Sequence, residues 1–177
     1  MKALLLLSLL FFSGTLASRA DEEESVKACR AHLKNIFTGN AEALEKSFAA
    51  EVTLMPGDEF LDPDYGFAKD KDRKESAKVT GKALTQALLK KVDSEGKPPQ
   101  EEMDKLFATL KFEPLEVKEG DFPVEPSEKV ETPDGKLHFK VVKDDVIFKV
   151  GPPEEKTVLL HLRKVDGHWV VVSEFLH

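Results

Sequence analysis

The sequence is poor in cysteine, tyrosine and tryptophan, each of which occurs once in 177 residues. A single cysteine cannot form an intramolecular disulfide, so the fold must depend on a hydrophobic core rather than on covalent cross-links. Cys29 shares one helical face with Val26, Leu33 and Ile36, and this spacing predicts a small buried side chain. A reactive thiolate would need a positively charged, partly exposed setting. The alternative for Cys29 is an intermolecular disulfide.

Motifs that bind cofactors and catalytic metals are also absent. There is no HExxH helix, no paired-cysteine zinc spacing, no glycine-rich phosphate loop and no GxSxG nucleophile elbow. Asp62, Asp64 and Gly66 begin like a calcium-binding loop. However, Phe67 stands where the sharp turn requires glycine, and Arg73 stands where a bidentate glutamate is needed. We therefore expect neither a cofactor nor a metal ion.

Only one long hydrophobic run occurs in the chain, and it lies at the N-terminus. Lys2 precedes the run Leu4 to Phe12, which is apolar except for Ser8, and small residues follow at Ala17 and Ala20. This order is typical of a secretory signal peptide. A membrane-spanning helix needs about 20 apolar residues, roughly twice what this run provides. A retained membrane anchor is therefore the less favoured alternative.

Signal cleavage is expected after Ala17 or, as we favour, after Ala20. The chain would then consist of a signal peptide at residues 1–20 and a mature domain at residues 21–177. The acidic stretch Asp21 to Glu24 would begin the mature protein. We expect this protein to be secreted or periplasmic.

Basic residues are outnumbered by acidic ones, 26 against 33, which gives a formal net charge of −7. Loss of Lys2 and Arg19 with the signal peptide would leave 24 basic residues and a net charge of −9. An acidic surface without a basic stripe repels phosphate backbones and anionic lipid headgroups. We therefore expect no nucleic-acid partner and, after signal removal, no membrane partner.

Apolar residues recur at helical spacing in the first two thirds of the chain. Ser25 is placed to cap the first helix, Gly39 to end it, and Asn40 to cap the second. Pro99 suits the first turn of a fourth helix. The predicted helices span residues 26–37, 41–48, 81–92 and 99–110.

Beyond Phe112 the apolar period changes to two, which is typical of strands. Pro133-Asp134-Gly135 and Asp166-Gly167 are turn sequences between alternating segments, so we expect consecutive hairpins and an antiparallel sheet. The predicted strands span residues 52–55, 115–118, 129–132, 136–142, 146–150, 157–165 and 169–176, and residues 56–80 are largely irregular. Helices followed by an antiparallel sheet predict a single α+β domain whose helices cover one sheet face.

Both faces of the last predicted strand are mostly apolar. Strict alternation places Trp169, Val171, Ser173 and Phe175 on one face, and Val170, Val172, Glu174 and Leu176 on the other. A strand buried on both sides fits a sheet with helices or a pocket on one face and a second cover on the other. That cover is either a second subunit, which would make a homodimer, or the segment 93–126.

Four short stretches carry a family resemblance. They are Phe37-Thr38-Gly39-Asn40 at the end of the first helix, Ala41 to Phe48 running into Val52-Thr53-Leu54, Gly81-Lys82-Ala83, and Leu162 to Val171 at the closing hairpin. Over most of residues 25 to 176 their order resembles the nuclear transport factor 2-like superfamily, also called SnoaL-like or ketosteroid-isomerase-like. The segment from Asp93 to Pro126 departs from the compact pattern of this superfamily.

The resemblance implies a strongly curved sheet wrapped around helices to form a cone, with a pocket inside and frequently a dimer across the sheet. It does not imply a reaction, because the superfamily includes isomerases, dehydratases, hydrolases and non-catalytic binding domains. No catalytic pattern of the family carries over onto specific residues of this chain.

Tyr65 is the first candidate for a functional residue. It follows Asp62 and Asp64 in the loop after the first strand, where it would overhang a pocket mouth. A tyrosine donor beside a carboxylate, Asp58 or Asp62, would suit enolisation or dehydration. The alternative is an aromatic side chain that anchors a polar loop.

His161 is the second candidate. It shares a strand face with Leu159 and Arg163, and Glu174 in the next strand would lie near it if the hairpin register allows. A paired histidine and carboxylate is a general-base candidate, and a satisfied structural pair is the alternative. We expect His138 to be solvated, and His32, His168 and His177 are assigned no role.

Two functions fit this sequence. The first, which we favour because a clear acid–base signature is missing, is a non-catalytic exported module that binds a small apolar molecule or a partner in a cone-shaped pocket. The second is a cofactor-independent lyase, isomerase or hydrolase of the SnoaL-like type. It would use His161 with Glu174, or Asp58 or Asp62 near Tyr65.

Overall fold

Residues 4–67, 75–126, 130, 132–152 and 157–175 are described by the structure, a computed structural model of the chain, and of residues 4–20 only the backbone is described. The helices are α1 (Leu4–Thr38), α2 (Ala41–Ser47), η1 (Glu59–Leu61), η2 (Pro63–Tyr65), α3 (Gly81–Glu95) and α4 (Gln100–Thr109). The strands are β1 (Phe48–Leu54), β2 (Ala77–Thr80), β3 (Lys111–Pro114), β4 (Gly120–Val124), β5 (Leu137–Val141), β6 (Val146–Gly151), β7 (Val158–Val165) and β8 (His168–Phe175). Within these ranges no helix has the length and apolarity that a membrane span requires.

Six strands form one sheet in the order β2-β1-β8-β7-β6-β3. Neighbouring strands run antiparallel except β1 and β8, which pair in parallel. The two other strands, β4 and β5, pair antiparallel as a separate ribbon. The predicted α+β fold, with helices packed on a mostly antiparallel sheet, is therefore confirmed.

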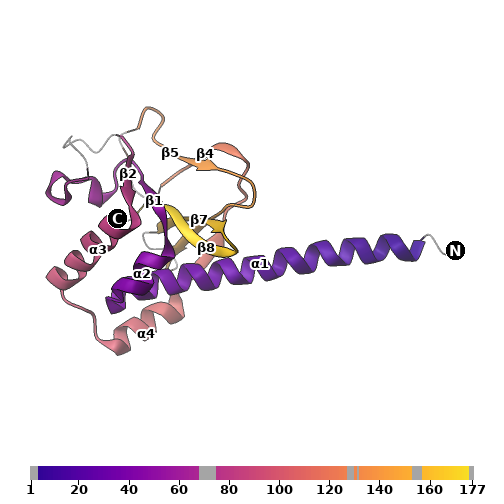
Figure 1. Cartoon of the computed structure of the whole chain (residues 1–177), viewed down its shortest axis with the longest axis horizontal. Coiled ribbons are helices and arrows are strands. Elements are labelled where there is room, and N and C mark those ends of the chain that lie inside the picture. The colour runs from indigo at the N-terminus through magenta and orange to yellow at the C-terminus, as the bar shows by residue number, and fades with distance from the viewer. Residues whose placement is uncertain (1–3, 68–74, 127–129, 131, 153–156, 176–177) are drawn as a thin grey trace.

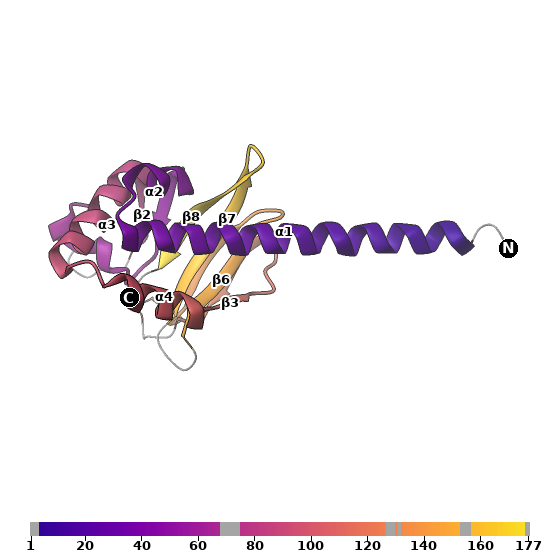
Figure 2. The same cartoon turned by 90° about the horizontal axis from the view of Figure 1, so that it is seen from below.

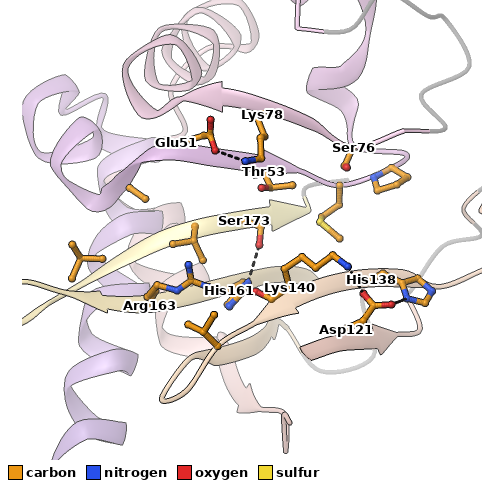
Figure 3. A pocket seen from close by; sticks show the side chains of 16 residues that line it. Glu51, Thr53, Ser76, Lys78, Asp121, His138, Lys140, His161, Arg163 and Ser173 are labelled. Atoms are coloured by element: carbon orange, nitrogen blue, oxygen red, sulfur yellow. Dashed lines mark hydrogen bonds and ion pairs between the residues drawn. The ribbon is translucent and has the colours of Figure 1, made fainter. Parts of the chain in front are cut away.

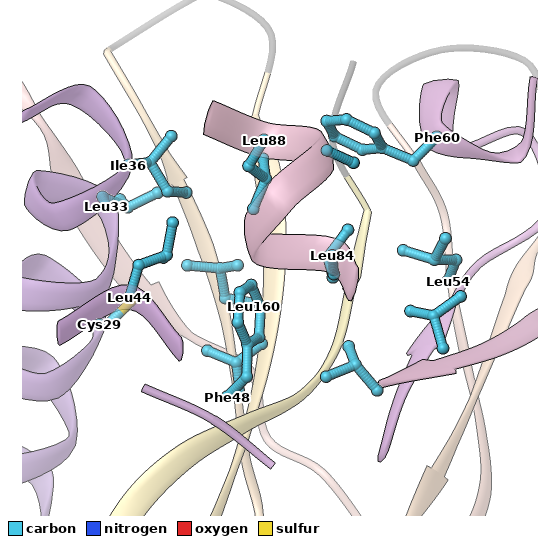
Figure 4. Packing of buried hydrophobic residues seen from close by; sticks show 14 of the residues in the cluster. Cys29, Leu33, Ile36, Leu44, Phe48, Leu54, Phe60, Leu84, Leu88 and Leu160 are labelled. Carbon is cyan, nitrogen blue, oxygen red and sulfur yellow. The ribbon is translucent and has the colours of Figure 1, made fainter. Parts of the chain in front are cut away.

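The six-stranded sheet has a different cover on each face (Figures 1 and 2). Helices α1, α2 and α3 pack on the face that we call inner, where they share one hydrophobic cluster with the sheet. Figure 4 shows Leu84 and Leu88 of α3 between Leu33 of α1 and Leu54 of β1. A fully buried leucine stabilises a fold by roughly 1.5–3 kcal/mol relative to an exposed one. Burial of these leucines therefore stabilises the packing of the helices on the inner face.

The face that we call outer is partly covered by the β4–β5 ribbon. Val124 and Phe139 of the ribbon belong to a second hydrophobic cluster with Ile147, Leu159 and Phe175 of the sheet. Because β4 lies in the segment 93–126, this segment supplies part of the second cover, as one of the two alternatives predicted.

Gly39 and Asn40 form the turn between α1 and α2, as the sequence predicted. Gly39 has a φ of 71°, and Asn40 caps α2 by accepting a hydrogen bond from the N–H of Ala43 at 3.2 Å. The predicted Ser25 cap is wrong, because Ser25 lies inside α1, which begins at Leu4. Its hydroxyl donates to the carbonyl of Glu22 at 2.9 Å, a local bond that serine can make within a helix.

Three strand predictions need correction. Residues 115–118 form no strand, since the strand of this region is β3, which ends at Pro114. Strand β5 pairs with β4 and not with residues 129–132. Val130 is not in a strand, and residues 129 and 131 lie outside the described residues. Pro123 concealed β4, but a proline is tolerated on an edge strand that pairs on one side only. Strand β2 lies within residues 56–80, a segment that was predicted to be largely irregular.

A β-bulge in β8 changes which side chains face inward. His161 pairs with Ser173 and Leu162 pairs with Val171, so Val172 is an extra residue without a partner in β7. Val171 belongs to the inner cluster, whereas Val172 and Ser173 both lie on the outer face. The predicted strict alternation is therefore wrong beyond Val172, because a bulge shifts the phase of the strand by one residue.

Candidate functional site

A cleft of about 620 Å³ lies on the outer face, between the sheet and the ribbon (Figure 3). We call it the outer cleft. Its labelled polar side chains are Glu51, Thr53, Ser76, Lys78, Asp121, His138, Lys140, His161, Arg163 and Ser173. Lys78 Nζ donates to Glu51 at 2.6 Å, and Lys140 Nζ donates to Asp121 at 3.4 Å. The cleft is thus polar, with basic and acidic groups paired across its strands.

Four side chains in or next to the cleft wall form the outer polar cluster, namely Asp145, His161, Arg163 and Ser173. His161 Nδ1 lies 2.9 Å from Ser173 Oγ, and His161 Nε2 lies 2.8 Å from Asp145 Oδ2. Arg163 donates from Nε to Asp145 Oδ1 at 2.8 Å and from Nη2 to Asp145 Oδ2 at 2.7 Å. His161 and Ser173 are only 1% and 4% exposed. Both imidazole nitrogens therefore bind protein groups rather than bulk water.

Asp145 holds this cluster together from the turn before β6. The N–H of Val142 also donates to Asp145 Oδ2, at 2.9 Å. Burial alone would raise the pKa of Asp145, but the hydrogen bonds from Arg163 and His161 outweigh burial and hold the pKa well below its usual range. Asp145 was not among the candidate residues identified from the sequence. The sequence did contain a signal for a carboxylate partner. His161 and Arg163 lie on one strand face, and two such side chains together attract a carboxylate.

The structure does not bring His161 and Glu174 together. Across β7 and β8, His161 lies opposite Ser173, and Glu174 lies opposite Leu160. Successive side chains of a strand point to opposite faces, so His161 faces outward and Glu174 faces inward. The general-base pair considered for these two residues does not form.

Glu174 instead lies beside His32 of α1 in the inner layer. His32 Nε2 is 3.4 Å from Glu174 Oε2, and His32 Nδ1 is 2.8 Å from Ser47 Oγ. In the described part of the chain, neither Glu174 oxygen nor His32 Nε2 has a hydrogen-bond partner. Both residues are almost fully buried. His32, to which the sequence assigned no role, is therefore a core residue.

Asp58, Asp62 and Tyr65 lie on the loop that contains η1 and η2. Asp58 and Asp62 each accept a hydrogen bond at a helix start, from the N–H of Phe60 at 2.9 Å and of Asp64 at 3.0 Å. The Tyr65 ring packs edge-on against Phe60, with centroids 4.8 Å apart. These contacts are those of an aromatic that anchors a loop. Among the described residues, no group of three His, Cys, Asp or Glu side chains is placed to hold a metal ion.

Two further residues behave as their sequence context predicted. His138 lies exposed on the ribbon between Asp121 at 2.9 Å and Asp134 at 3.0 Å, and hydrogen bonds to both carboxylates raise its pKa. Cys29 is fully buried in the inner cluster, and burial raises the pKa of its thiol to about 12. The thiol therefore stays protonated and contributes packing rather than reactivity.

A second concavity, an apolar groove of about 320 Å³, lies where α1, α3 and α4 meet β6 and β7. We call it the inner groove. Its apolar lining consists of Leu33, Ile36, Phe37, Leu88, Val92, Leu106, Leu110, Val150 and Val158. At the rim, Lys91 donates to Glu59 and lies 3.8 Å from Glu95. Burial alone would lower the pKa of Lys91, but these carboxylates raise it above its ordinary value.

Comparison with known proteins gives a distant structural similarity. No family model and no curated protein matches the sequence. Among solved structures, the chain is similar to a protein of unknown function with a cystatin-like fold from Nostoc punctiforme. The two share 11% sequence identity, the match covers 86% of each chain, and the TM-score is 0.41. A similarity of this strength carries no information about function.

Proposed function

We propose that this protein binds a small apolar molecule in the inner groove, without catalysis there. The volume of the groove, about 320 Å³, lies at the lower end of the range of about 300–1,000 Å³ found for small-molecule sites. Such sites are mainly apolar, with a few polar groups that orient the ligand. The inner groove has both features.

The unfilled apolar surface of the groove carries this proposal. Phe37, Leu106, Leu110 and Val158 line it and are only partly buried. Covering such surface with a ligand gains roughly 25 cal/mol for each Å² removed from water. The rim charges of Lys91 and Glu59 are bonded to each other, so a ligand needs no strong charge to match them.

The location also agrees with the resemblance to the nuclear transport factor 2-like superfamily, which implies a pocket between helices and sheet. The alternative of a lyase, isomerase or hydrolase that pairs His161 with Glu174 lacks its required geometry, because these residues face opposite sides of the sheet. Tyr65 contacts Phe60 rather than a base. Ligand binding is therefore the function we favour.

Titration with the apolar fluorescent dye N-phenyl-1-naphthylamine tests the proposal. We expect saturable binding to one site, weakened at least tenfold in Leu106→Trp, because the larger side chain fills the groove. Lys105→Trp adds the same indole at the exposed neighbouring position of α4 and serves as the matched control. Equal binding to both variants, or no saturable binding to the unaltered protein, would refute the proposal.

A further inference from the structure

We propose that Ser173 is an activated nucleophile in the outer cleft, with His161 as its general base. Asp145 is ionised and can only accept hydrogen bonds, so the nitrogen that faces it, His161 Nε2, carries a hydrogen. A neutral imidazole then has its lone pair on Nδ1, which lies 2.9 Å from Ser173 Oγ. The serine hydroxyl donates to that lone pair. A serine that donates to a histidine oriented by a carboxylate is the arrangement that activates the hydroxyl.

Arg163 holds the carboxylate that orients His161. Its two hydrogen bonds hold Asp145 in place and balance the charge of the carboxylate. Asp145 therefore does not need a positively charged imidazole as its partner. His161 Nδ1 faces the hydroxyl of Ser173 and is the atom placed to accept its proton. Asp145 and Arg163 are thus positioning residues, which act through His161.

The bulge in β8 presents Ser173 to the cleft. If β8 alternated strictly through Val171, Val172 and Ser173, with no bulge, Ser173 would share the inner side of Val171 and point into the core. The bulge instead places Val172 and Ser173 side by side in the cleft wall. Figure 3 shows the Ser173 hydroxyl bonded to His161 at the edge of the open space.

The inner layer contains a contrasting array of the same residue types. Ser47 Oγ lies 2.8 Å from His32 Nδ1, and His32 faces the carboxylate of Glu174. However, Ser47 donates its hydrogen to the carbonyl of Leu44 at 2.6 Å. It cannot donate the same hydrogen to His32, so this serine is not activated. The two arrays provide a test and its control in one chain.

The chemistry that fits the outer cleft is acyl transfer from a small carboxylic ester. Ser173 Oγ would attack the carbonyl carbon while His161 Nδ1 takes the hydroxyl proton, and the C–O bond to the alcohol would break as the alcohol takes that proton from His161. Water would then release the acid from Ser173 by the same route. Lys140 lines the cleft and supplies positive charge for the oxyanion, while Val142 and Val165 offer apolar contacts for the acyl group.

This reaction is separate from ligand binding in the inner groove, because the two concavities lie on opposite faces of the sheet. The test treats the folded full chain with a fluorophosphonate probe, which loses fluoride as its phosphorus bonds to an activated serine, and maps the label by peptide mass spectrometry. We expect the label on Ser173 and hydrolysis of 4-nitrophenyl acetate that falls at least tenfold in Ser173→Ala. Ser47→Ala is the matched control and should keep full labelling.

A role for Asp145 in positioning predicts that Asp145→Asn slows labelling at least tenfold per folded molecule. A purely structural role would lower the melting temperature but leave that rate unchanged. Mapping on the unaltered protein decides the main claim even if a variant does not fold. A native protein that leaves Ser173 unlabelled, or a Ser173→Ala variant that keeps both labelling and turnover, would overturn it.

Discussion

At the scale of single residues, β8 carries two successive buried polar side chains, and each one meets a histidine. Ser173 bonds to His161 on the outer side, whereas Glu174 faces His32 on the inner side. Because Ser47 donates to Leu44, its oxygen accepts from His32 Nδ1–H. The remaining His32 nitrogen, Nε2, lies 3.4 Å from the Glu174 carboxylate, so the two buried polar groups face each other.

This buried pair should show strong coupling in a double-mutant cycle. His32→Leu alone is expected to lower the free energy of unfolding by about 3 kcal/mol, because it leaves Glu174 buried without a partner. The variant with both His32→Leu and Glu174→Leu should unfold within about 1 kcal/mol of the original protein or be more stable, since apolar groups replace the whole pair. Urea denaturation followed by circular dichroism measures all four proteins. Losses that simply add would contradict the coupling.

Asp145 should make stability depend on acid. Its pKa in the folded protein lies below that of an unfolded aspartate, about 3.9. The resulting stabilisation is present above about pH 4 and is lost as the pH falls toward the folded pKa. Asp145→Asn removes this titration, so the free energy of unfolding should be lower near neutral pH and should fall less steeply below about pH 4. Denaturant titrations at several pH values test this.

The exposed neighbour Asp144 provides the control for that measurement. Asp144→Asn makes the same change of charge, and asparagine tolerates the positive φ of 65° found there. We expect its acid dependence to match that of the unaltered protein. An equal change in both variants would show that net charge, rather than the buried carboxylate, sets the response.

At the scale of elements, the local signals predicted well and the long-range pairings did not. Gly39 and Asn40 mark the turn between α1 and α2 because caps depend on a few adjacent residues. The parallel pairing of β1 with β8 joins the strands of the sheet that come first and last along the chain. No local sequence signal specifies this pairing. The same limit applies to the site. His161 was recognisable from its strand face, whereas its partners Asp145 and Ser173 depended on a turn and a bulge.

Gly81 shows how closely two elements approach. A Cβ atom at this position, the first of α3, would lie 2.7 Å from Phe48 Cβ and 2.8 Å from the carbonyl oxygen of Ala49. Gly81→Ala should therefore push α3 away from β1 and lower the free energy of unfolding by about 1–3 kcal/mol, the usual cost of overpacking. Lys82→Ala, at the next and exposed position, should change it by less than about 0.5 kcal/mol. Equal denaturation midpoints for these variants and the original protein would argue against a tight contact.

At the scale of the whole molecule, one sheet separates an apolar groove from a polar cleft. The inner groove is bounded by helices, and the outer cleft is bounded by the ribbon and the sheet. The sequence predicted helices on one face and a second cover on the other, since that arrangement follows from hydrophobic periodicity. The positions of both concavities depend on packing between distant segments, which periodicity does not encode.

Signal removal would also concern the whole molecule, and we propose a mature protein that begins at Asp21. Lys164 Nζ, at the end of β7, lies 2.7 Å from Asp21 Oδ1 and 3.7 Å from Glu24 Oε2. A cut after Ala20 would keep both carboxylates, so the mature domain would retain these contacts. Intact-mass analysis of protein recovered from the exported fraction should give the mass of residues 21–177. Recovery of the uncut chain in the membrane fraction would favour the anchor instead.

The bulge at Val172 also bears on how related chains would differ in length. If Val172 were removed, Val171 would pair as before and Ser173, Glu174 and Phe175 would keep the sides that they occupy now, because the extra residue alone separates the two phases. A relative with one residue fewer at this point would therefore retain the serine, the carboxylate and the closing aromatic in their places. A single-residue gap at Val172 would therefore be compatible with an unchanged site.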